Sequence, residues 1–368
     1  MNESFAHHPH PLARYGWDEQ VAAAFAPYAA QGLLPARVVR VHRAGCDILT
    51  ADGTCRAGTG PVATRDPVNS LTTGDWAAVG DGDDGRPEVK AVLPRRTAFL
   101  RSTSSKRSEG QVLAANIDHA VIAVPLAADP DLGRLERFVS LAWASGAAPF
   151  VALTKADLVP EAATLSHLAE DCRGVAPGVP VLTVSSRTGE GIDGLRAAVA
   201  GSGTTVLLGV SGAGKSTLAN ALLGEDTQTV YAVRDRDGKG RHTTTTRDLL
   251  PLPGGGVLID TPGLRGVGLW DAEHGLDHAF SEIEELARTC RFQDCAHRSE
   301  PGCAVTAAAE DGSLPERRLD SYRKLLRENA YLAARTDVRL RNEQKQQAKQ
   351  RRAHGRRAAE HKRRGHRP

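Results

Sequence analysis

The chain has 368 residues, of which 40% are hydrophobic and 25% charged, a globular composition with room for two or three domains. It has no run of 18 apolar residues and no apolar stretch after a basic one near its start, so we expect no membrane span, no secretory signal and a cytoplasmic location. The net charge of +3 is uneven, because residues 335–368 carry 13 Lys/Arg and only 3 Asp/Glu. Such a basic tail is either a solvated extension or a contact for RNA phosphates.

The first third of the chain predicts a helix followed by a small β domain. Residues 1–35 form an N-terminal extension with one short helical stretch at 18–30. Residues 36–97 contain short alternating runs, and these predict strands at 37–42, 46–50, 75–79 and 88–93. Such closely spaced strands indicate a small barrel such as an OB-fold, although other small β domains have the same pattern. The Ser/Lys/Arg-rich stretch in residues 98–111 predicts a linker.

Residues 112–268 have an α/β pattern, in which apolar strands alternate with amphipathic helices. This alternation predicts a doubly wound parallel sheet, where ligands bind at the carboxyl ends of the strands. Residues 269–334 are polar and helical, and residues 335–368 are the basic tail. The predicted strands are 120–125, 148–153, 179–184, 204–208 and 257–259, and the predicted helices are 132–145, 161–172, 192–200, 281–287 and 315–334.

A glycine-rich loop between a strand and a helix predicts a phosphate-binding site. It matches G-x-x-x-x-G-K-[ST], in which backbone N–H groups surround a phosphate, the lysine reaches the β and γ oxygens and the last hydroxyl binds Mg²⁺. A chance match in a glycine-rich chain is the alternative, and the flanking strand and helix argue against it. The expected contacts are Gly209, Val210, Ser211, Gly212, Ala213, Gly214, Lys215, Ser216 and Thr217.

Two further segments complete a predicted nucleotide switch. Asp260-Thr-Pro-Gly263 follows the last strand, where Asp260 holds Mg²⁺ through water and Gly263 senses the γ-phosphate. A Gly/Thr-rich loop at 238–247 is expected to close on Mg²⁺ through a threonine hydroxyl, although an ordinary polar loop has the same composition. Ser216, Thr245 and Asp260 are therefore the expected magnesium ligands.

The base is predicted to be guanine. Thr154-Lys-Ala-Asp157 follows a strand, and the Asp157 carboxylate can accept hydrogen bonds from the N1–H and amino group of guanine, which adenine lacks. The Lys155 stem can cover the base, and Ser185 and Ser186 offer backbone N–H groups to the guanine carbonyl. In most GTPases these motifs follow the phosphate loop, whereas here they precede it. The order predicts a circularly permuted GTPase, whose joined ends lie close together in space.

A cluster of metal-ligating residues lies beyond the α/β region. Cys290, Cys295, His297 and Cys303 offer three sulfurs and one nitrogen within fourteen residues, which suits a closed tetrahedral Zn²⁺ site with a structural role. Buried cysteines beside a surface histidine are the alternative.

Taken together, these motifs resemble the ribosome-small-subunit-dependent GTPase A family of bacteria. The permuted order, the glycine-rich loop, Gly240-Arg-His-Thr-Thr-Thr245, Asp260-Thr-Pro-Gly263 and the Cys/His spacing all match, as do segments 111–118 and 134–137. The resemblance implies an N-terminal OB-fold, a permuted GTPase core and a C-terminal helical zinc domain. It also implies GTP hydrolysis stimulated by the 30S subunit, a role in late 30S maturation as a checkpoint and release switch, and binding to 16S rRNA.

Hydrolysis is expected to proceed without the usual glutamine, because Leu264 follows Asp260-Thr-Pro-Gly263. His242 is the candidate to replace it, as proposed for the resembling family, and a loop histidine that contacts rRNA or solvent is the alternative. Lys215, Thr244 and Thr245 complete the expected catalytic set. Thr154 stands where many relatives have Asn. The other hypotheses are an RNA-binding assembly platform with structural nucleotide, and a permuted GTPase acting on the large subunit or on tRNA. We expect a monomer.

Overall fold

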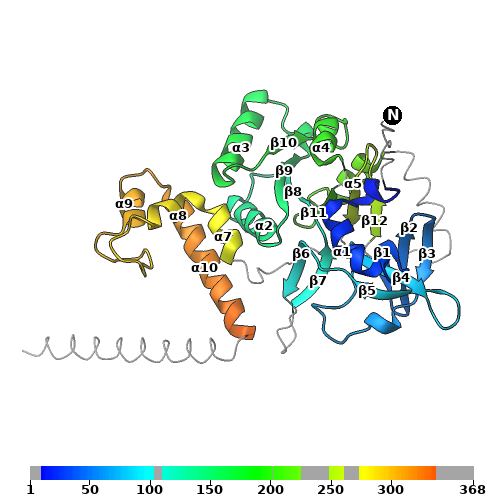
Figure 1. Ribbon diagram of the computed structural model, residues 1–368. Coiled ribbons are helices and arrows are strands. Elements are labelled where there is room, and N and C mark those ends of the chain that lie inside the picture. The colour runs from blue at the N-terminus through cyan, green and yellow to red at the C-terminus, as the bar shows by residue number, and fades with distance from the viewer. Residues whose placement is uncertain (1–9, 103–109, 202, 225–247, 261–272, 337–368) are drawn as a thin grey trace, which may run out of the picture.

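The fold is described by a computed structural model that carries three connected units (Figure 1). A β-barrel lies at one end, an α/β sheet with its helices in the centre, and a helical unit at the other end. The structure describes residues 10–102, 110–201, 203–224, 248–260 and 273–336.

The barrel is a five-stranded antiparallel sheet in the order β3-β2-β1-β4-β5. A parallel bridge between Gly58 and Glu88 joins the ends of the two outer strands and closes the sheet. This pairing is that of an OB-fold, so the predicted barrel is confirmed. The four predicted strands are present, and one more strand forms the second half of a hairpin. The strands are β1 (Leu34–His42), β2 (Gly45–Thr50), β3 (Gly53–Ala57), β4 (Trp76–Asp81) and β5 (Pro87–Val92), with a short 3-10 turn at Gly60–Val62.

The N-terminal helix covers one face of this barrel. Helix α1 (Glu19–Ala29) begins where the Asp18 carboxylate accepts a hydrogen bond from the backbone N–H of Val21, after a 3-10 turn at Ala13–Tyr15. Val21 and Phe25 are buried against Trp76 of β4. The helix therefore belongs to the hydrophobic core of the barrel, and the helical stretch expected at 18–30 is confirmed.

The segment expected to be a linker contains paired strands. β6 (Ala98–Ser102) and β7 (Gly110–Ala115) form an antiparallel two-stranded sheet, and residues 103–109 lie outside the described part of the chain. Phe99 and Leu113 are buried in the same core as the α/β sheet. The linker expectation for residues 98–111 is thus corrected, because these apolar side chains have a core to enter.

The central sheet has the order β10-β9-β8-β11-β13-β12, and its first five strands are parallel. Helices α2 and α3 pack on one face with side chains such as Val206, whereas α4 and α5 pack on the other with Leu207. The predicted doubly wound fold is confirmed, with β12 as an unpredicted antiparallel edge strand. The elements are β8 (His119–Pro125), α2 (Leu132–Ala144), β9 (Ala148–Thr154), α3 (Ala162–Val175), β10 (Val181–Val184), α4 (Ile192–Val199), β11 (Thr204–Leu208), α5 (Lys215–Leu223), β12 (Asp248–Pro251) and β13 (Val257–Asp260).

Two arginines of β1 hold the barrel against this sheet. Arg37 is fully buried, lies over the Trp76 ring, and donates hydrogen bonds to the Asn116 carbonyl (3.2 Å) and the Thr204 hydroxyl (2.8 Å). Burial lowers the pKa of Arg37 to about 10. Arg40 makes a two-point ion pair with the carboxylate of Asp248 in β12. The barrel is therefore attached to both β11 and β12.

The C-terminal unit is helical and packs on α2. It contains α7 (Glu273–Ala279), α8 (Ser281–Ala287), α9 (Ala304–Glu310) and α10 (Glu316–Thr336), of which α8 and α10 were predicted. Helix α7 approaches α2 so closely that a Cβ at Gly275 would lie 2.1 Å from the Ser140 carbonyl oxygen. Only glycine fits this contact, which fixes the start of the C-terminal unit on the α/β domain.

A buried cluster of charges adds to this contact. Glu136 of α2 is fully buried and accepts hydrogen bonds from Arg317 (3.0 Å) and Arg318 (2.9 Å), and also from the Ser321 hydroxyl. The Arg318 side chain is 3% exposed, pairs with Glu282, and lies over the Phe280 ring at 4.1 Å. Each buried charge has a partner of opposite sign, as buried charges require.

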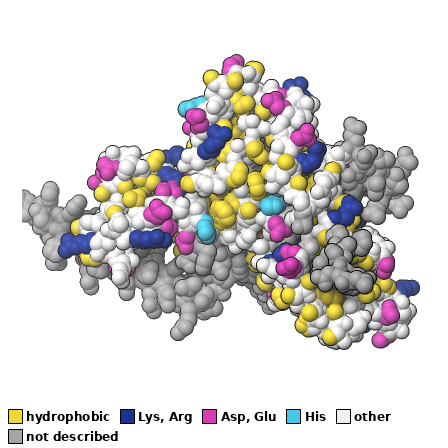
Figure 2. Space-filling model, turned by 45° about the horizontal axis from the view of Figure 1, so that its top comes forward, with side chains coloured by type: hydrophobic (Ala, Val, Ile, Leu, Met, Phe, Trp, Pro, Cys, Tyr) yellow, Lys and Arg dark blue, Asp and Glu magenta, His cyan; other side chains and the backbone are white. Residues whose placement is uncertain are grey.

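On the face drawn in Figure 2, basic and acidic side chains are interspersed among apolar ones. Within the described residues, no helix has the length and apolar character needed to cross a membrane.

We expect Glu136→Ala to destabilise the protein by about 3 kcal/mol, because it removes the fully buried one of the two carboxylates that pair with Arg318 and leaves the hydrogen bonds from Arg317 and Ser321 unmade. The matched control is Glu328→Ala, which removes the half-exposed partner of Arg137 and should cost about 1 kcal/mol or less. Urea denaturation followed by circular dichroism measures both. Equal losses in the two variants would contradict a special role for the buried cluster.

Candidate nucleotide-binding site and metal centre

The glycine-rich loop lies between β11 and α5, as the sequence predicts. Its backbone needs glycine at three turns: φ is +138° at Gly209, +79° at Gly212 and +85° at Gly214. A Cβ at Gly209 would also lie 2.6 Å from the Ala123 carbonyl oxygen of β8. The loop opens onto the N-terminus of α5, whose first N–H groups carry partial positive charge and suit an anion.

Backbone carbonyls of the glycine-rich loop hold the Lys215 side chain over this loop. The Lys215 ammonium group donates hydrogen bonds to the carbonyl oxygens of Gly209 (2.8 Å) and Val210 (2.7 Å). Phosphate oxygens are charged and therefore stronger acceptors than these carbonyls, so the same amine can turn to a bound phosphate. The hydroxyl-bearing residues Ser216 and Thr217 at the start of α5 are exposed.

The loops after β9 and β10 meet at the Asp157 carboxylate. Asp157 accepts a hydrogen bond from the buried Ser185 hydroxyl (2.5 Å) and one from the Arg187 guanidinium (2.7 Å). These two bonds, the Ser185 bond first, hold the pKa of Asp157 below its ordinary value. Asp157 is therefore ionised near neutral pH and can accept hydrogen bonds from N–H donors. Lys155 adopts a left-handed conformation (φ +61°) just before it, and Ser186 is half-buried beside Ser185.

Thr154 joins the base loop to the phosphate loop. Its buried hydroxyl lies 2.7 Å from the Ala213 carbonyl oxygen and 3.4 Å from that of Val124, so its proton goes mainly to Ala213. Sequence reasoning assigned Thr154 to the base site but missed this bond, because the two residues are 59 positions apart. It also left Arg187 out of the site, although Arg187 directly follows Ser185 and Ser186 in the sequence.

The remaining expected nucleotide residues are not all within the described chain. Asp260 is the last residue of β13, in register with Asp248 of β12, and only its backbone is described. His242, Thr244, Thr245 and Gly263 lie outside the described residues.

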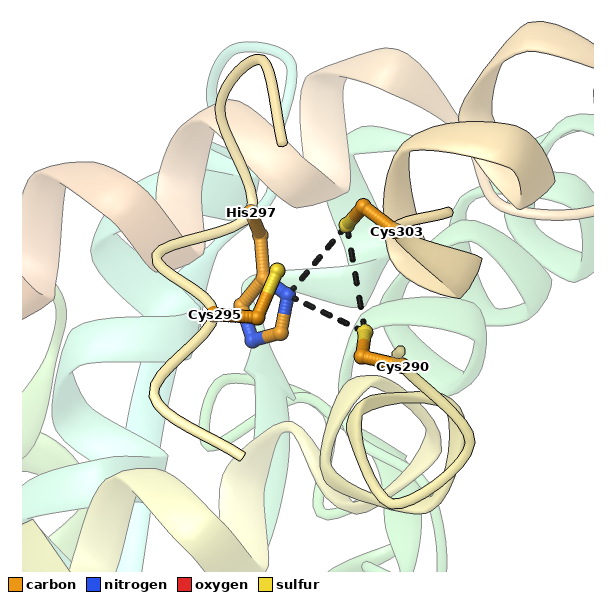
Figure 3. A group of neighbouring side chains, drawn as sticks. All are labelled: Cys290, Cys295, His297 and Cys303. Atoms are coloured by element: carbon orange, nitrogen blue, oxygen red, sulfur yellow. Dashed lines mark hydrogen bonds between the residues drawn. The ribbon is translucent and has the colours of Figure 1, made fainter. Parts of the chain in front are cut away.

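The four metal-ligating side chains come together in the C-terminal unit (Figure 3). Their ligand atoms, from Cys290, Cys295, His297 and Cys303, all lie within 4.8 Å of one another. The His297 Nδ1 atom is 3.6 Å from the Cys290 sulfur and 3.5 Å from the Cys303 sulfur, and these two sulfurs are 3.9 Å apart.

The distances among Cys290, His297 and Cys303 fit a tetrahedral metal. Zinc bonds of about 2.3 Å to sulfur and about 2.05 Å to nitrogen would place two sulfurs about 3.8 Å apart and sulfur about 3.55 Å from nitrogen. The predicted ligand set is therefore compatible with zinc, and all four positions of the tetrahedron are filled by protein. Such a closed set suits a structural metal rather than one that binds a reacting water.

The surrounding loop presents these ligands. The Glu300 carboxylate accepts hydrogen bonds from the backbone N–H groups of Arg298, Ser299 and Ala296, and these lower its pKa to about 2. Burial raises the pKa of the Cys303 thiol, but hydrogen bonds from the Thr306 hydroxyl and amide outweigh it and lower the pKa to about 6. The easily formed thiolate is the form that binds a metal.

Helix α10 also holds His297 in place. This histidine has a left-handed backbone (φ +53°), and its carbonyl oxygen accepts two hydrogen bonds from the Arg323 guanidinium. Sequence reasoning missed Arg323, since nothing in the Cys/His spacing points to a helix 26 residues away. Arg323 thus ties the metal loop to the helix that also contributes Arg318 to the contact with α2.

An OB-fold, a GTPase domain whose base motifs precede its phosphate motif and a closed Cys₃His cluster define a circularly permuted GTPase. The family model described as RsgA GTPase matches residues 92–270. Proteins named "Small ribosomal subunit biogenesis GTPase RsgA" are similar: that of Streptomyces coelicolor is 63% identical over 99% of this chain and 100% of its own, and that of Opitutus terrae is 44% identical over 89% and 92%. The chain belongs to the RsgA GTPase family and is a GTPase.

Two solved structures share the fold. YjeQ from Thermotoga maritima aligns with a TM-score of 0.60 and 24% identity, covering 81% of this chain and 98% of its own. YloQ, titled a circularly permuted GTPase, aligns with a TM-score of 0.58 and 22% identity, covering 81% and 95%. The permuted architecture inferred from motif order is therefore confirmed.

We expect Thr154→Val to weaken nucleotide binding by about fivefold or more, because the change removes the buried hydrogen bond between the base and phosphate loops. Thr154→Ser retains a hydroxyl and should bind as the parent does. Titration with a fluorescent GDP analogue measures both affinities, and circular dichroism checks the fold. Parent-like binding by the valine variant would mean that the Thr154–Ala213 bond does not support the site.

Proposed function

We propose that this chain hydrolyses GTP at the site formed by residues 209–217 and the two base loops. The observation that carries the proposal is the meeting of three separate segments: Thr154 contacts Ala213, and Asp157 contacts Ser185. The phosphate loop and an ionised acceptor for guanine are thereby joined at one edge of the sheet. In this proposal Lys155 covers the base, Ser186 offers its N–H to the guanine carbonyl, and Lys215 binds the β and γ oxygens.

The metal of this reaction is proposed to be Mg²⁺, held by Ser216, Thr245 and Asp260 together with phosphate oxygens. Thr244 and Thr245 would close the first switch, Gly263 would sense the γ-phosphate, and His242 would orient water. Supporting this role of His242 is Leu264, which has no polar atom where other GTPases have glutamine.

The proposed partner is the small ribosomal subunit with its 16S rRNA. The relatives carry the name of small ribosomal subunit biogenesis GTPases, and 63% identity over nearly the whole chain supports the same role here. The basic tail, residues 335–368, offers cations for RNA phosphates. In this role the GTP form would bind the 30S subunit as a late assembly checkpoint, and hydrolysis would release the protein. A monomer in the cytoplasm suits this function.

Turnover measurements test this proposal. GTP hydrolysis by the full chain is measured alone, with 30S subunits and with 50S subunits, and we expect strong stimulation by 30S only. Stimulation by 50S would favour a large-subunit GTPase instead. Slow turnover under all three conditions, with RNA binding retained, would favour an assembly platform in which nucleotide is structural.

Guanine selection should depend on Asp157. Asp157→Asn replaces one acceptor by a donor, so the variant should lose GDP binding and gain binding of xanthosine diphosphate, whose base offers an acceptor at that position. Competition of both nucleotides against a fluorescent analogue measures the exchange. A variant that binds GDP like the parent and ignores xanthosine diphosphate would remove Asp157 from the base site.

We propose that the Cys₃His cluster binds one Zn²⁺, which stabilises the C-terminal unit rather than taking part in chemistry. Cys295→Ser leaves three good ligands, so the purified variant should contain well under one zinc per chain and its C-terminal unit should unfold first on heating. Metal analysis and limited proteolysis measure these outcomes. Cys55→Ser, which changes an exposed cysteine of β3 in the barrel, is the control and should keep its zinc. Less than about one zinc in the parent protein would count against the site.

A further inference from the structure

The carboxylate proposed to read guanine already has two partners within the protein. Asp157 Oδ1 accepts a hydrogen bond from the Ser185 hydroxyl, and Oδ2 accepts one from Arg187 Nε. The two partners differ in their surroundings: Ser185 is fully buried, whereas the Arg187 side chain is 72% exposed. Asp157 itself is only 10% exposed.

The two partners also differ in how easily they can leave. Ser185 has a second bond, from the Thr188 backbone N–H to its hydroxyl oxygen, and lies in the protein interior. Arg187 extends through solvent, and its pair with Asp157 rests on a single N–H donor, Nε, rather than on a two-point fork. Exposed ion pairs contribute little to stability and weaken with salt. The Ser185 bond is thus a fixed support, whereas the Arg187 bond is exchangeable.

Arg187 presents the same chemistry as the base that Asp157 is proposed to bind. A guanidinium and the N1–C2–N2 edge of guanine are both planar and both direct N–H donors at a carboxylate. Adenine has no such pair of donors on that edge, so it cannot replace the arginine.

We propose that Arg187 is an internal competitor of guanine: it pairs with Asp157 in protein without nucleotide and is displaced when guanine arrives. The proposal rests on the reading of guanine by Asp157 and adds a determinant of affinity and selectivity. Guanine compensates the lost ion pair with its own donors. An adenine nucleotide would break the Arg187–Asp157 pair without offering N–H donors to Asp157 in its place, so Arg187 adds to the discrimination against adenine.

The test compares nucleotide binding by full-length protein with and without the competitor. A fluorescent GDP analogue is titrated into the parent, Arg187→Ala and Arg173→Ala, each stripped of nucleotide. Arg173→Ala removes the same charge from an exposed position on α3 and controls for the general attraction of phosphates. We expect Arg187→Ala to bind about two- to fivefold more tightly than the parent, in line with the small contribution of exposed ion pairs.

The kinetics sharpen this expectation. Because the arginine has already left in the complex, its removal should raise the association rate and leave the dissociation rate unchanged. The difference between Arg187→Ala and the parent should also shrink at high salt, which screens the ion pair. Weaker binding by Arg187→Ala, or a faster dissociation rate, would make Arg187 a support for the bound base and overturn the proposal, and so would unchanged binding.

A second pair of variants separates this inference from the proposed function. In an Asp157→Asn background the charge partner is gone, so adding Arg187→Ala should no longer tighten binding of xanthosine diphosphate. If Asp157→Asn fails to accept xanthosine diphosphate, the assignment of the base site is wrong. If it does accept it while Arg187→Ala leaves GDP binding unchanged, the base site stands and the competitor is refuted.

Discussion

Parallel strand pairing is the constraint on which the nucleotide site depends. The pairing of β10, β9, β8 and β11 brings the carboxyl ends of all four strands to one edge of the sheet, whatever the order of the strands along the chain. The loops after β9, β10 and β11 therefore converge, although the phosphate loop comes last in sequence. Permutation leaves this geometry intact because the contacts that join the loops, such as Thr154 with Ala213, depend on space and not on chain order.

Permutation does change what the chain does after β13. The chain leaves the sheet at Asp260 and enters α7 at Glu273, and α7 is pressed onto α2 at Gly275. The C-terminal unit is thus bound to the GTPase domain by packing and by the Glu136–Arg318 cluster, in addition to its covalent connection through the chain. A movement of this unit relative to the sheet would therefore carry α2 with it or break a buried ion pair. Since α2 joins β8 to β9, the former route leads back to the loop that carries Asp157.

The sequence predicted those strands and motifs that a local pattern of residues determines. Apolar runs placed the strands of the central sheet to within two residues, and the glycine-rich and Cys/His motifs lie where their spacing put them. Strand β12 was missed because Asp-Leu-Leu-Pro is too short to form a pattern and exists as a strand only beside β13. In the sequence, Glu136 has the pattern of a surface charge on an amphipathic helix. Its burial could not be predicted because it depends on Arg318, 182 positions away. Long-range partners of this kind have no local signal.

Two carboxylates with arginine partners show how burial decides the role of an ion pair in this protein. Glu136 and Arg318 are both removed from water, so water cannot replace their hydrogen bond when the pair is broken, and the pair is suited to hold two units together. Asp157 also sits among protein atoms, but Arg187 remains in solvent and is well solvated without its partner. Separating that pair costs little, which suits a position where another molecule is to bind. The same pair of residue types therefore fixes the C-terminal unit at one end of the domain and, in our proposal, provides an exchangeable contact at the nucleotide edge.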